Sequence, residues 1–474
     1  MPGVAPVVVA AGRPLPEAEV HIPASVAARL GLPAGGSVHV ATRSSVEAGR
    51  VVIEADPAGG GPPVLWVHPR LLHELRIPSG VALRARYEPT TRTLSLGPFV
   101  GILALRSRRG SRYGEHEPFF RALTRMGQRL HVGAFVFGPR DVDWSQRQVF
   151  GYAYVGSRPQ GSWRRSVYPL PDVVYDRVQT RKAEGSKGFA AFRTRLAQAV
   201  PRWFNEPGFF DKWRMHTALY QNERLRRFLP ETALYRGPAD LAHFLDKYGI
   251  AYMKPVGGSL GLGIVRLHRT EDGYVASYQP GETLLMRRAS SIRSLAQIVA
   301  RLTRRGPFII QQGLPLARWR GRVFDVRILM QRTTGGAWAL TKMFSRIAPA
   351  GSFTANLTRG GQGCRIDWLL RRVYGSRWPA VHRALRAAGF ELAREIEKTI
   401  PGVIGELGLD LGLDRRGRIW LIEVNSKPFL QMTREAGSVR TLSLSVQRPL
   451  RFAAYLAGFD ENGADADEER CERD

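Results

Sequence analysis

Hydrophobic and polar positions divide the chain into a strand-rich beginning and a longer part in which strands and helices alternate. Up to residue 97 the apolar positions mostly alternate with polar ones, which is typical of strands with one buried face. From Pro98 onward, apolar runs alternate with segments of helical period, which is typical of α/β and α+β domains. The pattern therefore predicts a small β-rich region followed by a larger region of helices and strands.

The β-rich region is an internal repeat, because its apolar and turn residues return 45 positions later. Each copy predicts a strand, a short helix (25–30 and 70–75), a turn and further strands (51–54 and 93–96). Its sequence shows no convergence of His, carboxylate or nucleophilic residues, so we expect interaction or substrate presentation rather than catalysis. The matching positions are Ile22, Leu30, Leu32, Pro33, Gly35 and Val38 in the first copy and Val67, Leu75, Ile77, Pro78, Gly80 and Leu83 in the second.

The region after Pro98 opens with strand and helix in alternation. The pattern predicts a strand at 100–105, a helix at 117–130, a strand at 134–137 and, further on, a helical stretch at 211–227. The last residues are acidic and contain Gly and Ala, which is typical of a disordered tail. We expect four parts: a β-rich two-repeat domain at 1–97, an α/β domain at 98–185, a larger domain at 186–455 and an acidic, disordered tail at 456–474.

Three side chains suited to a metal ion lie on two predicted strands near the C-terminus. The first strand carries Asp410, a turn follows at 414–417, and the second strand, 419–424, brings Glu423 and Asn425 to its end. Because side chains alternate along a strand, Glu423 and Asn425 face the same way. Two carboxylates and an amide oxygen suit Mg²⁺ held between protein and phosphate. The alternative is an ordinary hairpin with solvated polar ends.

A glycine-rich loop follows a predicted strand that ends in Lys254. Glycines let backbone N–H groups approach phosphate oxygens closely, and an ammonium group balances the phosphate charge. Such a loop alone is also common in ordinary turns. Its place between Lys212 upstream and the Glu423–Asn425 pair downstream makes phosphate binding the better interpretation. The loop residues concerned are Gly257, Gly258, Ser259 and Gly261.

Composition is that of a globular chain. The 474 residues, 44% hydrophobic and 9% aromatic, are enough for several domains with cores. Only two cysteines are present, Cys364 and Cys471, so no disulfide framework is implied and a reducing compartment fits. The start of the chain has no basic signal region, and its apolar run is too short for a membrane span. We expect a soluble, cytoplasmic protein.

The net charge of +29 would ordinarily indicate polyanion binding. The arginines are spread along the whole chain beside abundant Ala, Gly and Pro, which indicates a general coding bias instead. We therefore do not expect nucleic acid to be a partner. A salt-sensitive attraction to acidic substrates or surfaces stays open.

A series of short motifs runs in order from Pro98 to about Phe452: GPFVGIL, PLPDVVYDR, DKW, YMKP with its glycines, QQ, DVR, NLTRGG, and GLDL followed by EVN. In these motifs and their order the chain resembles the YheC/YheD family of ATP-grasp proteins, known as endospore coat-associated proteins. The resemblance implies an α+β ATP-grasp fold preceded by an α/β (pre-ATP-grasp) layer. It also implies ATP and Mg²⁺, with two ions expected and Mn²⁺ as an alternative, and a place in the mother cell or spore coat.

The resemblance also implies roles for single residues. Gln311 and Gln312, on a predicted strand at 308–312, stand at the hinge where the family meets adenine, although an acidic residue is usual there. Arg327, two positions after Asp325 on an apolar strand, becomes a phosphate contact rather than part of a structural ion pair. The implied catalytic residues are Arg327, Arg346, Asn356 and Arg359; the nucleotide-binding residues are Lys212, Lys254, Gly257, Gly258, Ser259, Gly261, Gln311 and Gln312; the metal ligands are Asp410, Glu423 and Asn425.

We therefore expect an ATP- and Mg²⁺-dependent carboxylate–amine or carboxylate–thiol ligase that works through an acyl phosphate in spore coat or envelope biogenesis. Its partners would be a small-molecule or peptide carboxylate and spore coat proteins. The alternative is a nucleotide-binding structural coat protein without turnover. Intact Asp410, Glu423 and Asn425 favour the enzyme, because a scaffold has little need for metal ligands. A third alternative is a polyanion-binding adapter, which only the net positive charge of the chain supports. The sequence names neither the acyl donor nor the acceptor.

Overall fold

The structure is a computed structural model, and it divides into two compact units. Unit 1 comprises 1–206, 332–337 and 443–474, and unit 2 comprises 207–331 and 338–442. The residues that the structure describes are 3–11, 15–33, 35–57, 62–107, 110–156, 161–206, 208–258, 261–281, 283–304, 306–355, 357, 360–430 and 439–460.

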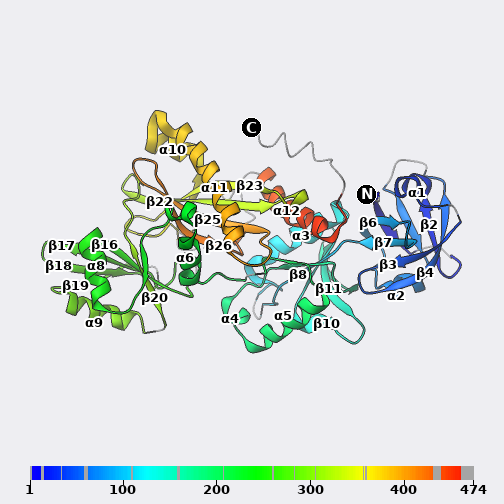
Figure 1. The fold of residues 1–474 in the computed structure, drawn as a ribbon, viewed down its shortest axis with the longest axis horizontal. Coiled ribbons are helices and arrows are strands. Elements are labelled where there is room, and N and C mark those ends of the chain that lie inside the picture. The colour runs from blue at the N-terminus through cyan, green and yellow to red at the C-terminus, as the bar shows by residue number, and fades with distance from the viewer. Residues whose placement is uncertain are drawn as a thin grey trace. The chain divides into compact units, whose positions relative to one another are not determined.

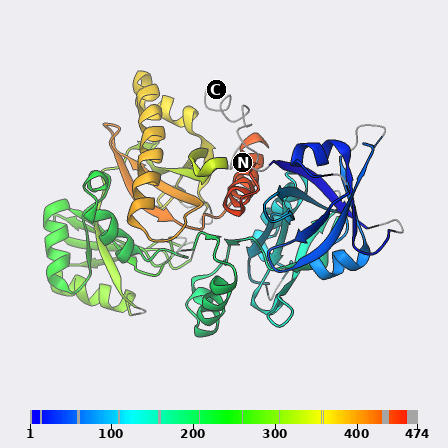
Figure 2. The same ribbon diagram turned by 45° about the vertical axis from the view of Figure 1, so that its right-hand side comes forward.

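The N-terminal strands of unit 1 form a closed barrel in the order β1-β5-β2-β4-β3-β7-β6, drawn in blue in Figure 2. Closure leaves no strand edge unpaired. Alternating apolar side chains, Val7, Val20 and Leu65 among them, fill the interior. The elements are β1 (Val4–Ala10), β2 (Glu19–Pro23), α1 (Ala24–Leu30), β3 (Ser37–Ala41), β4 (Val46–Glu54), β5 (Val64–Val67), α2 (Pro69–Leu75), β6 (Val81–Glu88) and β7 (Thr93–Gly97).

The two copies of the sequence repeat have equivalent backbones. Helices α1 and α2 both end at a left-handed residue, Gly31 with φ 67° and Arg76 with φ 58°. Trp66 lies 45 positions after His21 and is therefore its equivalent in the second copy. These two residues are paired in the sheet, on the antiparallel strands β5 and β2. A pairing of equivalent residues on antiparallel strands places a pseudo-two-fold axis at that point.

A mixed sheet follows the barrel in unit 1, in the order β10-β11-β9-β8-β13-β14 with β12 beside β11. Helix α3 packs on it through an apolar face that includes Phe120 and Leu123. One hydrophobic core runs from the barrel into this sheet. The elements are β8 (Phe99–Leu103), η1 (Gly114–His116), α3 (Glu117–Arg129), β9 (Gly133–Phe137), η2 (Pro139–Asp141), β10 (Val142–Asp143), β11 (Gln148–Val155), β12 (Ser162–Pro169), β13 (Val173–Asp176), α4 (Arg181–Glu184), α5 (Lys187–Ala199), β14 (Trp203–Phe204) and η3 (Thr334–Gly336).

The C-terminal helix α12 (Val439–Ala457) belongs to unit 1 from Ser443 onward. Phe452 packs edge-on against Phe204, with 5.4 Å between ring centroids. Arg84 of β6 donates a hydrogen bond of 2.6 Å to the carbonyl of Phe459. Helix α12 and the contact of Phe459 thus extend past residue 456, where the tail was predicted to begin. Residues 461–474 lie outside the described part. The division into four parts stays a prediction.

Unit 2 contains two sheets. The first has the order β15-β20-β16-β17-β18-β19 and packs against α8 and α9; the second has the order β24-β23-β22-β25-β26, with β21 beside β22, and packs against α10 and α11 (Figure 1). The elements are α6 (Lys212–Gln221), α7 (Glu223–Arg226), β15 (Thr232–Leu234), α8 (Pro238–Tyr248), β16 (Ile250–Pro255), β17 (Val265–Thr270), β18 (Gly273–Tyr278), β19 (Leu285–Ala289), α9 (Ile292–Leu302), β20 (Phe308–Gln312), β21 (Arg318–Trp319), β22 (Arg322–Arg332), β23 (Trp338–Ile347), β24 (Gln362–Arg365), α10 (Ile366–Tyr374), η5 (Gly375–Arg377), α11 (Trp378–Thr399), β25 (Glu406–Leu413) and β26 (Ile419–Asn425).

Most elements that the hydrophobic pattern predicts are present in the structure. The strand predicted at 308–312 is β20, and the helix predicted at 117–130 is α3. The helical stretch predicted at 211–227 is present as two helices, α6 and α7, because Asn222 interrupts it. Its side chain accepts a hydrogen bond of 3.1 Å from the backbone N–H of Arg224 and so caps a new helix, α7. Among the described residues no helix is both long and apolar enough to cross a membrane.

Candidate active site

A cleft of about 550 Å³ opens between the two sheets of unit 2. Strands β16 and β20 supply one wall with Lys254, Gln311 and Gln312. The opposite wall, from β22, β23, β25 and β26, supplies several charged side chains, among them Asp410 and Glu423. This volume lies within the range of small-molecule sites. The cleft is therefore the candidate active site.

Four charged side chains form one chain of ion pairs on the second wall. Arg346 donates to Asp325 at 2.6 and 2.8 Å and also lies 2.9 Å from Asp410 Oδ2. Arg327 holds the same Asp410 through two nitrogens, one of them 3.0 Å from Oδ2. The side chains of Arg346 and Asp410 are only 6% and 8% exposed. Solvent therefore screens these pairs weakly.

Asp410 stays ionised in this cluster. Burial alone would raise the pKa of its carboxyl group, but the charges and hydrogen bonds of Arg327 and Arg346 outweigh burial and lower it. Burial opposes the charge of Arg346 as well, and the neighbouring carboxylates Asp325 and Asp410 raise its pKa in spite of it. The guanidinium groups thus stabilise the charge of Asp410, whereas burial outweighs Arg346 at Asp325 and raises the pKa of that carboxyl group.

A β-bulge aims two consecutive residues of β26 at the cleft. Asp410 is paired with Glu423, whereas Leu411 is paired with Leu421, so Ile422 is the additional residue. Both Ile422 and Glu423 line the cleft, which regular alternation along a strand would prevent. The bulge therefore places an apolar side chain next to the carboxylate of Glu423.

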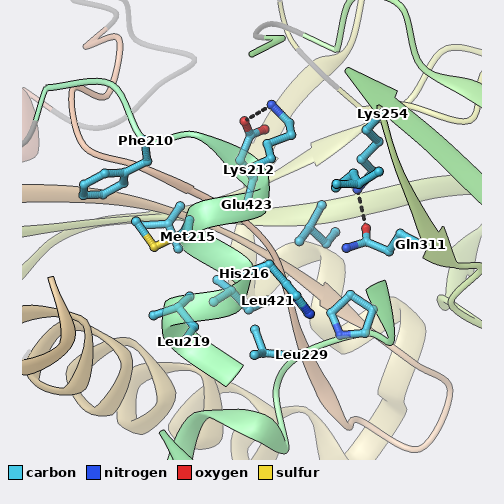
Figure 3. A pocket seen from close by; sticks show the side chains of 14 residues that line it. Phe210, Lys212, Met215, His216, Leu219, Leu229, Lys254, Gln311, Leu421 and Glu423 are labelled. Carbon is cyan, nitrogen blue, oxygen red and sulfur yellow. Dashed lines mark hydrogen bonds and ion pairs between the residues drawn. The ribbon is translucent and has the colours of Figure 1, made fainter. Parts of the chain in front are cut away.

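Lys212 connects the start of α6 to the glycine loop and to Glu423. Asp211 caps this helix by accepting a hydrogen bond of 2.9 Å from the backbone N–H of Arg214. From the first helical position, Lys212 Nζ lies 3.1 Å from Glu423 Oε1 (Figure 3). The same ammonium group donates to the carbonyl oxygen of Gly258. The ammonium group thus sits where loop and carboxylate meet.

Lys254 and Gln311 lie on the neighbouring antiparallel strands β16 and β20. Lys254 Nζ donates to Gln311 Oε1 at 2.5 Å (Figure 3). Gln311 Nε2 in turn donates to Thr232 Oγ1 at 2.9 Å. Burial lowers the pKa of Lys254 to about 8, although the nearby Glu423 opposes this change. Lys254 is therefore mostly protonated at neutral pH and loses its proton in mildly alkaline solution.

A second pocket, of about 50 Å³, shares Lys254, Gln311 and Glu423 with the cleft (Figure 3). Apolar side chains form most of its lining, among them Met215 of α6 and Leu421 of β26. His216 also lines it, and burial lowers the pKa of this imidazole to about 4, so it is neutral at pH 7. The pocket has room for water molecules but not for a nucleotide.

The structure brings most of the predicted site residues together. Lys254, Gly261, Gln311, Gln312, Arg346, Asp410 and Glu423 line the cleft. Lys212 and Gly258 contact one another, and Arg327 contacts Asp410. Asn425, on β26, is half-buried and paired with Gly408, and Gly257 is exposed beside Gly258. Ser259, Asn356 and Arg359 lie outside the described residues. The roles assigned to all of these residues stay predictions.

Sequence reasoning missed several cleft residues. Asp325 was treated only as a neighbour of Arg327, yet its ion pair is with Arg346 on β23. Their separation along the chain gives no signal of this pair. Tyr252, two positions before Lys254 on β16, also lines the cleft, and strand alternation would have found it. The turn residues Arg415 and Arg416 line the cleft too.

The fold and the cleft define an ATP-grasp protein. Residues 201–456 match the family model described as YheC/D like ATP-grasp, which is more than half of the chain. The chain belongs to this family. The family assignment made from the order of the sequence motifs is confirmed.

Two relatives from Bacillus subtilis (strain 168) support the assignment. The chain is 30% identical over 400 residues to endospore coat-associated protein YheD, covering 82% of this chain and 84% of YheD. It is 23% identical over 322 residues to endospore coat-associated protein YheC, covering 66% of this chain and 86% of YheC. Among solved structures it is similar to the ATP-grasp ligase PsnB complexed with minimal precursor, with 15% identity and a TM-score of 0.41 over 75% of this chain and 99% of PsnB.

Proposed function

We propose that this protein is an ATP- and Mg²⁺-dependent ligase that activates a carboxylate as an acyl phosphate and joins it to an amine or thiol. One observation carries the proposal: Lys254, Asp410 and Glu423 line the same cleft, although they come from two different sheets. A cation for phosphate and two carboxylates for a metal ion are the groups that phosphoryl transfer needs.

Adenine would bind near β20. Gln311 and Gln312 of this strand line the cleft together with Tyr252 and Ile422. These side chains offer an aromatic ring, an aliphatic surface and amide groups, the combination that suits a planar polar base. Lys254 would then contact the phosphates, next to the glycine loop at Gly258.

The carboxylates present fit a magnesium ion that is shared with phosphate. Asp410 and Glu423 lie directly opposite each other on paired strands, and Asn425 lies two positions further along β26. Within the described ranges no group of three His, Cys, Asp or Glu side chains converges to hold a metal by itself. Mg²⁺ commonly uses one or two carboxylates and takes its other ligands from phosphate and water.

Binding of metal and nucleotide would require a change of partners in the cleft. Asp410 is held by Arg327 and Arg346, and Glu423 by Lys212. A magnesium ion would compete with these cations for the carboxylate oxygens. The cations released would then be available for the phosphate oxygens, on which charge develops during transfer.

The proposed reaction has two steps. A carboxylate oxygen of the substrate attacks the γ-phosphorus, and the bond to the oxygen bridging the β- and γ-phosphorus atoms breaks, so that ADP leaves. An amine or thiol then attacks the carbonyl carbon of the acyl phosphate and displaces inorganic phosphate. Arg327 and Arg346 would stabilise the phosphoryl oxygens in the first step.

A nucleotide-binding structural protein without turnover is the second candidate. The pairing of Asp410 with two arginines favours this candidate, because a carboxylate neutralised by arginines can stabilise the fold without holding a metal ion. The names of both Bacillus relatives place them at the endospore coat. We propose spore coat or envelope biogenesis as the setting for either candidate, with coat proteins as partners.

Trapping with hydroxylamine tests the ligase proposal. Purified protein, ATP and Mg²⁺ are incubated with pools of amino acids, peptides and cell-wall precursors in the presence of hydroxylamine. An acyl phosphate would be captured as a hydroxamate, with ADP and phosphate formed in equal amounts. ADP with a stable phosphorylated product would indicate a kinase. ATP binding without ADP formation in any pool would favour the structural candidate.

A further inference from the structure

A group of exposed arginines lies beside the cleft in unit 2, and we call it the arginine patch. It consists of Arg320, Arg371, Arg372, Arg377, Arg415 and Arg416, all of which are exposed. Three segments supply them: the turn after β21, the end of α10 with η5, and the turn between β25 and β26. Figure 1 shows α10 at one end of the second sheet of unit 2.

Direct contacts join the three segments into one surface. The rings of Trp319 on β21 and Trp368 on α10 meet edge to face, with 5.2 Å between their centroids. The hydroxyl of Tyr374 donates a hydrogen bond of 2.7 Å to the carbonyl of Asp414. Arg377 donates one of 3.3 Å to the carbonyl of Arg415. The positive charges of the patch are therefore neighbours in space.

The patch lacks acidic partners. Among the described residues none of its six arginines is in an ion pair, whereas Arg227 and Arg269, exposed elsewhere on unit 2, pair with Glu391 and Asp246. The acidic residues nearest in sequence to α10 and to the turn before β26 are Asp367 and Asp414, and both contact other groups. Asp367 lies 3.5 Å from His382, and Asp414 accepts two backbone hydrogen bonds within its own turn. The patch thus presents positive charge that no ion pair within the described part of the chain neutralises.

Aromatic rings hold part of the patch in place. The guanidinium group of Arg372 lies over Trp368 at 4.1 Å from the ring centroid, and that of Arg320 lies over Trp319 at 4.8 Å. A guanidinium group stacked in this way keeps N–H groups at its edge for a planar anion. The same stacking covers one face of each indole, which nucleic-acid bases would need. Carboxylates therefore suit this surface better than bases do.

Backbone strain also occurs at the patch. Arg320 and Gly321 form the two central residues of the turn after β21, with φ of 50° and 73°. Glycine adopts such angles freely, but an arginine does so only at a cost. Strain of this kind concentrates where a side chain has a function that offsets it. In this turn it keeps an arginine over Trp319.

The patch continues into the cleft. Arg415 and Arg416 line the cleft together with Asp410 and Glu423. An anionic chain lying on Arg371 and Arg372 would thus reach the place where a carboxylate is to be activated. A chain that carries many carboxylates would serve both as the bound ligand and as the reacting group.

We propose that the arginine patch binds an acidic peptide segment, rich in Glu or Asp, and that this segment presents the substrate carboxylate to the cleft. As a statement about substrate class, the inference rests on the proposed ligase function. Charge complementarity and the uncovered edges of the stacked arginines select the ligand. Binding of the segment can be measured without turnover, so the two proposals can fail separately.

Fluorescence anisotropy with a labelled ten-residue oligoglutamate tests the proposal on the full-length protein. The patch variant is Arg371→Glu with Arg372→Glu. The matched control is Arg293→Glu with Arg301→Glu on α9, two exposed arginines of the same unit that have no ion pair among the described residues and give the same change in net charge. We expect affinity to fall about tenfold or more in the patch variant and to change little in the control.

Other readouts separate this proposal from the ligase function. Both variants should bind ATP as the wild type does in titration calorimetry, because neither pair of arginines lines the cleft. The proposal is overturned if oligoglutamate does not bind, if both variants lose affinity equally, or if a ten-residue oligouridylate binds more tightly through the same arginines. Patch-dependent binding supports the docking site even when hydroxylamine traps no acyl phosphate.

Discussion

Lys212 Nζ lies 3.1 Å from Glu423 Oε1, which links the first turn of α6 to the end of β26. Glu423 is 27% exposed and has one ion pair with a described residue, whereas Asp410, 8% exposed, is held by two arginines. The two carboxylates face each other on paired strands, and yet the fold depends on them to different degrees. This difference allows structural and chemical effects of substitutions to be separated.

Replacing Asp410 should cost stability. Asp410→Asn leaves Arg327 without its charged partner and Arg346 with one carboxylate instead of two. Loss of one partner from a buried ion pair costs about 3–5 kcal/mol. Urea unfolding of unit 2, monitored by tryptophan fluorescence, checks this value. An unchanged midpoint would mean that the arginines find other partners.

Replacing Glu423 should instead abolish chemistry and spare the fold. Glu423→Gln keeps the shape of the side chain and removes a negative metal ligand. The half-buried ion pair with Lys212 is a single contact and contributes about 1 kcal/mol. We expect ADP and hydroxamate formation to fall at least about a hundredfold, with an unfolding midpoint close to that of the wild type. A variant with full turnover would remove Glu423 from the metal site.

Lys254→Met should weaken ATP binding. One charge-assisted hydrogen bond to phosphate is worth about 1.5–3 kcal/mol, or about tenfold or more in affinity. Lys342→Met is the matched control, since Lys342 also has a pKa lowered to about 8 by burial but does not line the cleft. Titration calorimetry should show normal affinity for this control. Equal affinities in all three proteins would place the nucleotide elsewhere.

The pH dependence of ATP affinity should report on the same ammonium group. Because burial lowers the pKa of Lys254 to about 8, raising the pH through 8 removes the positive charge that would contact phosphate. Affinity of the wild type should therefore fall between pH 7 and 9. The affinity of Lys254→Met for ATP should not show this fall. If it falls by the same amount between pH 7 and 9, a group other than Lys254 causes the pH dependence.

Lys342 should destabilise the protein at neutral pH. Its side chain is 5% exposed, and burial alone lowers its pKa from 10.5 to about 8. The unfolded chain binds the proton more tightly, so the penalty is fully present below pH 8 and is relieved as the pH rises toward 10.5. Lys342→Met should raise the free energy of unfolding by about 1–3 kcal/mol at pH 7. The gain should shrink in alkaline urea titrations.

Sequence reasoning succeeded where the signal lies within one segment of the chain. The strands that carry Lys254, Gln311 and Gln312, and Glu423 and Asn425 are each predicted from a few adjacent positions, and the roles of these residues stay predictions. Helix α3 was predicted for the same reason, since its apolar period lies within one segment.

The rest depends on contacts between distant segments. Asp325 and Arg346 pair across two strands, and no spacing rule connects them. The bulge that turns Ile422 into the cleft is a shift in register between β25 and β26, which neither strand shows alone. Asn222 looked like one polar position in a helix, and only its hydrogen bond to Arg224 shows that a new helix begins there.

The pairing of His21 with Trp66 has an evolutionary consequence. These equivalent residues meet across the pseudo-two-fold axis of the barrel, and strands of one copy are hydrogen-bonded to strands of the other, as β1 is to β5 and β3 is to β7. A chain with a single copy would leave those edges open and could close a barrel only by pairing with another molecule. The ancestor of this region is therefore best pictured as a homodimer of half-length chains, which gene duplication and fusion later made into one polypeptide.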